Sequence, residues 1–281
     1  MERIIVIGNT GFIGSGLINY FRGKGKRVIT AGRKNADWYI DLERPDLSDC
    51  EKFKSGDYVL FTAAISSPDK CQHEFQSCWQ VNVDGTADII QKAIKKDARV
   101  LFFSSDAVYP SHSSQIFNEN SVMAPDFPYG KMKAEIEQQF AESKAFKAIR
   151  LSYVVSKRDK FMRYLLNCAD YDKKAEVFHP YYRNCITLTA VCEAVNWLIE
   201  NWIMFPSYCL NLAGLELVSR IRIADELKRI NEKLNYSIIE PEESFYLVRP
   251  PIIQMQSIYL YEYGIIKNKS FTESFQSEVR G

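Results

Sequence analysis

The feature that most constrains this chain is a turn with three evenly spaced glycines, which directly follows an apolar run near the N-terminus. Residues 4–17 read IIVIGNTGFIGSGL, so Gly8, Gly11 and Gly14 are three residues apart. A buried strand that runs through such a turn into a helix is typical of a pyrophosphate-binding site. Gly8 would allow the sharp turn, Gly11 would let phosphates approach the backbone, and Gly14 would let the helix pack against the strand. The N–H groups and partial positive charge of a helix N-terminus favour the same ligand.

The first half of the chain alternates apolar segments with longer amphipathic ones. The sequence predicts strands where Val, Ile, Leu and Phe are concentrated, at 3–8, 27–32, 57–64, 98–105 and 146–155. It predicts helices between them at 12–23, 75–96 and 129–143. Apolar runs without clean alternation suit parallel strands that are buried on both faces. The expected fold class is α/β, with a Rossmann-type doubly wound parallel sheet.

The alternation weakens in the second half of the chain. The pattern there predicts two helices and one short strand, at 187–202, 219–234 and 208–214 respectively. We predict a dinucleotide-binding domain formed by residues 1–155, to which residues 185–213 return. The remaining residues, 156–184 and 214–281, are expected to form a smaller substrate-binding lobe. Open α/β sheets bind ligands beyond the carboxyl ends of their strands, so the lobe is expected over that edge.

The composition argues against several classes of partner. Lys and Arg total 36 and Asp and Glu total 35, so the net charge of +1 offers no electrostatic footprint for a nucleic acid or an anionic membrane. The longest apolar stretch, 194–205, is shorter than the ~20 residues of a membrane span, and no secretory signal pattern is seen. The seven cysteines show neither paired nor zinc-site spacing, so we expect reduced thiols, a cytoplasmic location and no metal site.

The GxxGxxG spacing of the glycine turn resembles that of the extended short-chain dehydrogenase/reductase family. Three later segments resemble the same family. YIDLERPD resembles the short third strand, which lies beside the adenine of the cofactor; FTAAIS resembles the end of the fourth strand; and VNVDGT resembles the start of the following helix. The resemblance implies cofactor contacts from Gly8, Thr10, Gly11, Phe12, Ile13, Gly14, Asp41, Leu42, Ala63, Ala64, Asn82, Tyr129 and Lys133.

Two cations follow the second expected strand, at Arg33 and Lys34. Enzymes that select NAD usually carry an acidic residue there, which binds the 2′-hydroxyl of the adenosine ribose. Cations instead suit a 2′-phosphate, so the sequence favours NADP(H) over NAD. Ordinary solvated surface charges remain the alternative interpretation.

A second motif, YGKMK, carries an acid–base pair. Tyr129 and Lys133 are four residues apart, so both side chains lie on one face of the expected helix. A tyrosine has a reference pKa of about 10, which a nearby ammonium or a cationic nicotinamide lowers. Tyr129 can then exchange a proton with a substrate carbonyl, while Lys133 holds the nicotinamide ribose. In FFSSDAVYP, which resembles the end of the family's fifth strand, the Ser105 hydroxyl can bind that carbonyl and stabilise its developing charge.

Over its whole length the chain most resembles the dTDP-4-dehydrorhamnose reductase branch of that family, on the evidence of VRPPIIQMQSIYLYEYGI (248–265) and RLSYVVS (150–156). The resemblance implies reduction of a keto group on a nucleotide-linked deoxysugar. The expected substrate contacts are Asp106, Tyr153 and Arg183, with Arg158 and Arg163 as further candidates for the diphosphate.

The chain also departs from the branch, because Ser105 replaces the usual Thr and Ala107 replaces a larger residue. Sugar-nucleotide dehydratases carry an Asp-Glu pair after the active hydroxyl, whereas this chain has Asp106-Ala107, which argues against dehydration. Two alternatives stay open: a nucleotide-sugar epimerase of the same family, and a non-catalytic NADP-binding regulatory subunit. Look-alikes often form homodimers through helices at positions such as 75–96 and 129–143, so a homodimer is expected.

Overall fold

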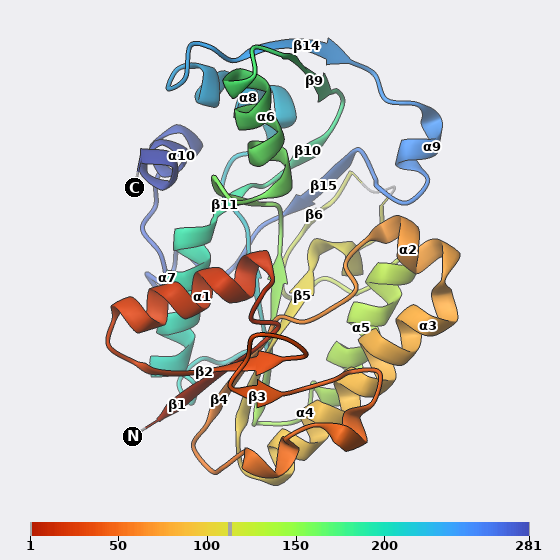
Figure 1. Ribbon diagram of the computed structural model, residues 1–281, viewed down its shortest axis with the longest axis vertical. Coiled ribbons are helices and arrows are strands. Elements are labelled where there is room, and N and C mark those ends of the chain that lie inside the picture. The colour runs from red at the N-terminus through yellow and green to blue at the C-terminus, as the bar shows by residue number, and fades with distance from the viewer. Residues whose placement is uncertain (1, 112–113, 281) are drawn as a thin grey trace. The chain divides into compact units, whose positions relative to one another are not determined.

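The computed structural model describes residues 2–111 and 114–280, which group into two compact units. Unit 1 comprises Met1–Pro110, Val122–Arg150 and Val195–Leu210, and unit 2 comprises Ser111–Ser121, Leu151–Ala194 and Asn211–Gly281 (Figure 1). Within the described part of the chain, no helix has the length and apolar character that a bilayer span requires.

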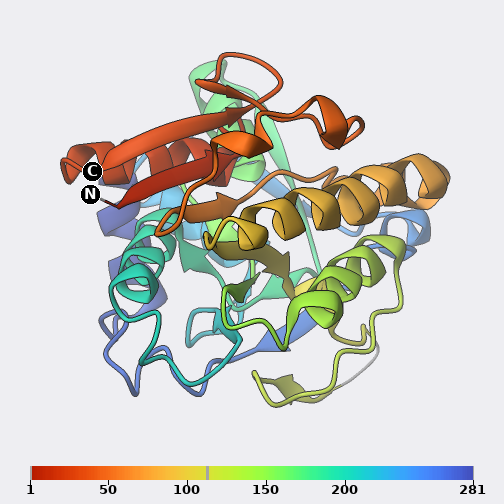
Figure 2. The same ribbon diagram turned by 90° about the horizontal axis from the view of Figure 1, so that it is seen from below.

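Unit 1 is built on a seven-stranded sheet with the order β12-β7-β5-β4-β1-β2-β3. The strands are β1 (Arg3–Ile7), β2 (Arg27–Gly32), β3 (Trp38–Tyr39), β4 (Tyr58–Phe61), β5 (Arg99–Ser105), β7 (Phe146–Leu151) and β12 (Cys209–Leu212). β1 pairs in parallel with β2 and β4, and Figure 2 shows β1 and β2, in red, running side by side. Every residue of β4 is buried, as expected for a strand covered on both faces. The predicted doubly wound parallel sheet is confirmed.

The helices of this unit follow the strands in the expected order. They are α1 (Phe12–Gly23), α2 (Pro68–His73), α3 (Phe75–Trp79), α4 (Thr86–Lys95) and α5 (Pro128–Phe140), and α7 (Leu188–Glu200) begins in unit 2 and ends here. Short 3-10 turns lie at η1 (Pro45–Leu47), η2 (Cys50–Lys52) and η4 (Asp106–Val108).

The single helix expected at 75–96 is interrupted by a π-helical turn, η3 (Gln80–Gly85). The interruption has a tertiary cause: a Cβ on Gly85 would lie 1.8 Å from the carbonyl oxygen of Leu42, so this stretch is pressed against a distant loop. π turns of this kind are frequent at functional sites.

Two other expected elements end early. β7 stops at Leu151, and the chain resumes extended structure only at β8 (Val154–Val155), which pairs in parallel with β11 (Ile186–Thr187) in unit 2. The helix expected at 219–234 is α8 (Arg220–Lys228), because a turn follows in which the Asn231 side chain accepts the N–H of Lys233. Such Asx turns compete with helical hydrogen bonding.

Unit 2 contains several short elements that the sequence pattern does not reveal. A four-stranded sheet has the order β13-β10-β15-β6, formed by Val218–Ser219, Tyr182–Arg183, Ile252–Met255 and Ile116–Phe117. A parallel pair joins β14 (Asn235–Ile239) to β9 (Lys174–Phe178). The helices α6 (Lys160–Asp170), α8, α9 (Glu243–Tyr246) and α10 (Phe271–Arg280) complete the unit. Its core includes Phe161, Leu165, Leu227 and Phe275.

Candidate active site

A cavity of about 570 Å³ opens in unit 1 beside the glycine turn, at the carboxyl ends of β1, β2 and β4. Nine of the expected cofactor contacts line it: Gly8, Thr10, Gly11, Arg33, Lys34, Asp41, Leu42, Ala63 and Ala64. The lining also includes residues that the sequence analysis did not single out: Ile7, Asn9, Gly32, Asn35, Ile40, Glu43, Thr62, Ile65, Lys70 and Val81. The other expected contacts, Phe12, Ile13, Gly14, Asn82, Tyr129 and Lys133, are not part of this lining.

The three glycines of the turn differ in what surrounds them. Gly8 has a φ of +96°, and a Cβ there would lie 2.7 Å from the backbone nitrogen of Ala63. A Cβ on Gly14 would lie 2.3 Å from the carbonyl oxygen of Gly8. A Cβ on Gly11 would meet only the Gly8 carbonyl oxygen, at 3.3 Å, and Gly11 lines the cavity. Gly8 and Gly14 are therefore needed by the protein's own packing, whereas Gly11 leaves space for a ligand, and the turn fits a dinucleotide pyrophosphate.

Charged side chains gather where the cavity meets the ends of β2 and β3. The exposed Arg33 guanidinium lies 3.1 Å from a carboxylate oxygen of Glu43, and both residues line the cavity. Beneath them Asp41 is almost completely buried. Burial raises the pKa of Asp41, but the N–H of Glu43, the Tyr39 hydroxyl and the charge of Arg33 outweigh burial and hold the pKa below its usual value. This end of the cavity therefore presents both cations and carboxylates.

Asn82 supports the wall of the cavity from behind. It lies in the π turn η3, where its side-chain oxygen accepts the N–H of Ile65 at 2.8 Å and its amide donates to the Ile65 carbonyl at 2.9 Å. Ile65 follows Ala63 and Ala64 in the lining. Asn82 therefore fixes the loop after β4, part of which lines the cavity.

The expected catalytic residues come from the end of β5 and the start of α5. Ser105 is the last residue of β5, and its hydroxyl donates to Asp106 at 3.1 Å and accepts the N–H of Ala107 at 3.2 Å. Tyr129 is in the first turn of α5. A Cβ on Gly130 would lie 2.0 Å from the carbonyl oxygen of Ala107, so the helix start is pressed directly against the turn that follows Ser105. The fold thus brings the two motifs together across a gap of more than twenty residues.

Lys133 lies one helical turn beyond Tyr129 and is buried. Its ammonium nitrogen donates to the carbonyl of Phe103 at 2.7 Å and lies 5.8 Å from the centre of the Tyr129 ring. Burial lowers the pKa of Lys133 to about 7, although the Glu137 carboxylate opposes this shift. Burial also raises the pKa of Tyr129, with further contributions from Cys71 and Asp106. The expected lowering of the phenol's pKa is therefore not seen in the protein alone, because burial disfavours both charged forms.

A fully buried ion pair lies behind Lys133 on the same face of α5. The Arg150 guanidinium binds Glu137 with N–O distances of 2.9 and 2.7 Å. It also donates to the hydroxyls of Tyr109 and Tyr208. This network joins α5 to β7 and to the segment after β5, so it fixes the helix that carries Tyr129 relative to the sheet.

Two of the expected substrate contacts lie in unit 2, beside one small cavity that also includes Tyr181 and Arg220. The Tyr153 hydroxyl donates to Asp159 at 2.7 Å, and burial followed by this carboxylate raises the pKa of Tyr153. Arg183 donates to the carbonyl of Pro250 at 2.8 Å. The third expected contact, Asp106, lies in unit 1 beside Ser105.

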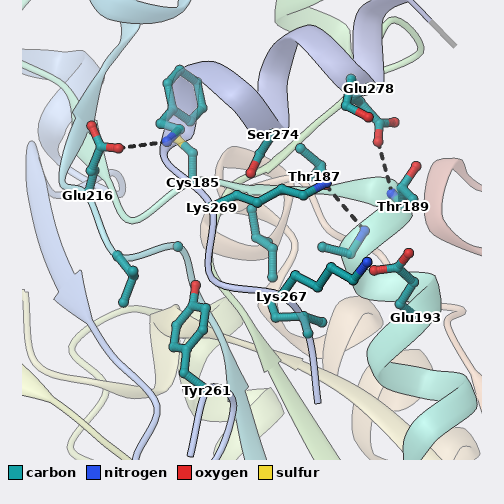
Figure 3. Close-up of a pocket in the computed structure, with 17 residues that line it drawn as sticks. Cys185, Thr187, Thr189, Glu193, Glu216, Tyr261, Lys267, Lys269, Ser274 and Glu278 are labelled. Atoms are coloured by element: carbon teal, nitrogen blue, oxygen red, sulfur yellow. Dashed lines mark hydrogen bonds between the residues drawn. The ribbon is translucent and has the colours of Figure 1, made fainter. Parts of the chain in front are cut away.

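A separate cavity of about 170 Å³ in unit 2 is lined by the start of α7, by α10 and by the loops at 214–216 and 266–269 (Figure 3). Glu278 accepts the N–H of Thr189 at 3.0 Å, and Glu216 accepts the N–H of Phe271 at 2.6 Å, so both carboxylates cap helix ends. None of the expected site residues lines this cavity. Among residues 2–111 and 114–280, no group of three or more His, Cys, Asp or Glu side chains could hold a metal ion.

A glycine turn at the end of the first strand of a parallel sheet, opening into a cavity of this size, defines a dinucleotide-binding protein of the Rossmann type. The chain belongs to the NAD dependent epimerase/dehydratase family, whose model matches residues 4–179. The resemblance to the extended short-chain dehydrogenase/reductases is thereby confirmed.

Three curated relatives match about half of the chain. A dTDP-4-dehydrorhamnose reductase from Aggregatibacter actinomycetemcomitans is 28% identical over 140 residues, covering 49% of this chain and 46% of that protein. A UDP-glucose 4-epimerase from Halalkalibacterium halodurans is 28% identical over 149 residues, covering 49% and 45%. The methionine adenosyltransferase 2 subunit beta of Pongo abelii is 24% identical over 148 residues, covering 50% and 43%. The matched segment spans less than half of each relative's length.

Solved structures match the whole chain. A dTDP-4-dehydrorhamnose reductase from Yersinia enterocolitica has a TM-score of 0.82 at 20% identity and covers 100% of this chain and 99% of its own. The enzyme of the same name from Bacillus anthracis, solved in complex with NADP, has a TM-score of 0.82 at 17% identity and covers 99% and 97%. At these identities the likeness establishes the fold.

Proposed function

We propose that this protein is an NADP(H)-dependent reductase that acts on the keto group of a nucleotide-linked deoxysugar, similar to dTDP-4-dehydrorhamnose reductase. One observation supports the proposal: the start of α5, which carries Tyr129 and Lys133, packs against the turn that follows Ser105, within the unit that contains the glycine-turn cavity. Ser105, Tyr129 and Lys133 supply a hydroxyl donor, a proton donor and an amine, which is the set that carbonyl reduction needs.

The cavity residues Gly8, Gly11, Arg33, Lys34 and Ala63 would hold the dinucleotide. NADPH, when bound, supplies a hydride to the carbonyl carbon of the substrate. In the proposed roles Ser105 binds the carbonyl oxygen and Tyr129 gives it a proton. Because burial raises the pKa of Tyr129, its phenol stays protonated at neutral pH, which is the form that a proton donor requires.

The comparisons support this choice of reaction. A curated relative and two solved structures of matching fold carry the name dTDP-4-dehydrorhamnose reductase, and one of those structures contains NADP. Ala107 stands where dehydratases of the family carry a glutamate, so the chain lacks the second carboxylate expected for dehydration. The nucleotide and the sugar are best sought among dTDP- and UDP-linked ketosugars.

The test is to incubate the protein with NADPH and each of a panel of nucleotide ketosugars, and to measure NADPH consumption from the loss of its absorbance. We expect turnover with at least one 4-ketosugar. The same assay with NADH in place of NADPH serves as the comparison. Turnover that is retained after Tyr129→Phe would contradict the proposed chemistry.

The epimerase alternative is supported by the relative named UDP-glucose 4-epimerase, which is as similar as the reductase over the matched segment. An epimerase would keep its cofactor bound and interconvert two sugars without net consumption of NADPH. The regulatory alternative is supported by the relative named as a subunit of methionine adenosyltransferase. In that case Tyr129→Phe would leave the biological activity unchanged.

We also propose that the protein works in the cytoplasm and forms a homodimer. All seven cysteines lie in the part of the chain that the structure describes; they are buried and form no disulfide bond, which suits a reducing compartment. Sedimentation of the purified protein tests the dimer, and the helices α4 and α5 are the first surfaces to examine.

A further inference from the structure

Two acidic side chains line the end of the cavity beside β2, and they differ in how many hydrogen bonds their carboxylates accept. Arg33, Lys34, Asp41 and Glu43 all line this end of the cavity. Asp41 has little capacity left, because one of its oxygens accepts the N–H of Glu43 at 3.0 Å and the other accepts the Tyr39 hydroxyl at 3.0 Å. The Glu43 carboxylate instead has an exposed partner, Arg33, at 3.1 Å, with side-chain exposures of 56% and 61% respectively.

This ion pair meets the two dinucleotides in different ways. A 2′-phosphate attracted to Arg33 brings a dianion next to the Glu43 carboxylate, and it must also take the guanidinium away from that carboxylate. A 2′-hydroxyl carries no charge and can donate a hydrogen bond to Glu43, as acidic residues do in NAD-binding sites. Arg33 and Glu43 therefore favour opposite cofactors from the same position.

We propose that Glu43 is a specificity-determining residue, which opposes the 2′-phosphate of NADPH and accepts the 2′-hydroxyl of NADH, so that the chain binds both cofactors. This inference rests on the proposed function. Removal of the Glu43 carboxylate should make the protein more selective for NADPH.

The size of the effect follows from the exposure of the pair. Exposed charges act through a high effective dielectric and are screened by salt. Loss of the carboxylate charge in Glu43→Gln is therefore expected to tighten NADPH binding by roughly fivefold at low salt. NADH binding should stay the same or weaken, since glutamine is a poorer acceptor than a carboxylate. Arg33→Gln should act in the opposite direction and weaken NADPH binding alone.

The experiment measures the dissociation constants of NADPH and NADH by the fluorescence of the reduced nicotinamide, with no sugar substrate present. The variants are Glu43→Gln and the matched control Glu51→Gln, which removes an exposed charge in η2 outside the cavity lining. We expect the NADPH-to-NADH affinity ratio to rise for Glu43→Gln only, and the rise to shrink at about 0.5 M salt. Equal melting temperatures would show that the variants fold.

Two results overturn the inference, and they are distinguishable. If the unmodified protein binds both cofactors and the ratio for Glu43→Gln stays within about twofold of the Glu51→Gln control, Glu43 does not set specificity and the proposed function stands. If the unmodified protein binds neither cofactor, the proposed function fails together with the inference.

Discussion

Glu137 and Arg150 form an ion pair whose two side chains are only 0% and 1% exposed. The pair joins α5 to β7, and the Tyr109 hydroxyl adds a contact from the segment after Ser105. Because Glu137 is four residues beyond Lys133, the same contacts fix the helix face that carries Tyr129. The position of the proton donor therefore depends on a charge pair in the core.

Glu137→Gln should lower the free energy of unfolding by about 3–5 kcal/mol, because it leaves the Arg150 guanidinium buried without a counter-charge. Urea denaturation followed by circular dichroism measures this change. Glu142→Gln, which removes an exposed charge just after α5, is the control and should change stability by less than about 0.5 kcal/mol. If the two variants are equally stable, the buried pair is not what anchors the helix.

Tyr129→Phe should reduce kcat by about 100-fold or more, since a positioned general acid contributes about that much. The dissociation constant of NADPH should change little, because Tyr129 does not line the cavity. Tyr171→Phe removes a hydroxyl from a residue that is 74% exposed in unit 2 and serves as the control. Activity of Tyr129→Phe close to that of the control would exclude Tyr129 as the proton donor.

Lys133 gives the stability of the protein a pH dependence with a defined sign. Burial lowers the pKa of Lys133 to about 7 from a usual value of 10.5, so between these values the unfolded chain binds a proton that the folded chain does not. The free energy of unfolding should therefore rise with pH across this window, by at most about 1.4 kcal/mol per pH unit. Lys133→Met should lose this rise, so it should be more stable than the unmodified protein at pH 6 and lose the advantage near pH 10. Parallel stability curves for the two proteins would contradict the assignment.

Gly11 and Gly14 should respond differently to substitution by alanine. Gly14→Ala places a methyl group 2.3 Å from the Gly8 carbonyl oxygen, so it should lower the melting temperature by several degrees. Gly11→Ala meets only one atom, at 3.3 Å, so its melting temperature should change little. Its NADPH affinity should nevertheless fall by roughly tenfold or more, because the methyl group occupies the approach of the phosphates. Thermal melts and cofactor titrations of both variants test the distinction, and normal NADPH affinity in Gly11→Ala would exclude close backbone approach.

The sequence predicts the first strands and helices of unit 1 closely, because their signals are local. The bounds of α1 and β2 agree with the segments expected at 12–23 and 27–32, where apolar runs are bounded by glycine. The π turn at Gln80–Gly85 could not be foreseen, because it is associated with the close approach of Gly85 to the carbonyl of Leu42, which is distant in the sequence. The two-residue strands of unit 2, such as Tyr182–Arg183, are too short to carry a period.

The site shows the same division between local and distant causes. Gly8, Gly11 and Arg33 were recognisable because each stands in a short contiguous stretch of sequence, the glycine turn or the end of the second strand. Glu43 was missed because an exposed acid after a two-residue strand has no local signature, and only the fold brings it to Arg33. The raised pKa of Tyr129 was also unforeseeable, since burial comes from the packing of distant segments.

The π turn has a consequence for insertions and deletions in this chain. Such a turn amounts to one extra residue in a helix, and each residue advances the helix by about 100°. Deleting one residue within Gln80–Gly85 should therefore restore regular winding while turning the Asn82 amide away from Ile65. Far-ultraviolet circular dichroism should remain nearly constant while NADPH affinity falls. Cofactor binding would then depend on the irregular winding of this helix as well as on the identity of the side chains that line the cavity.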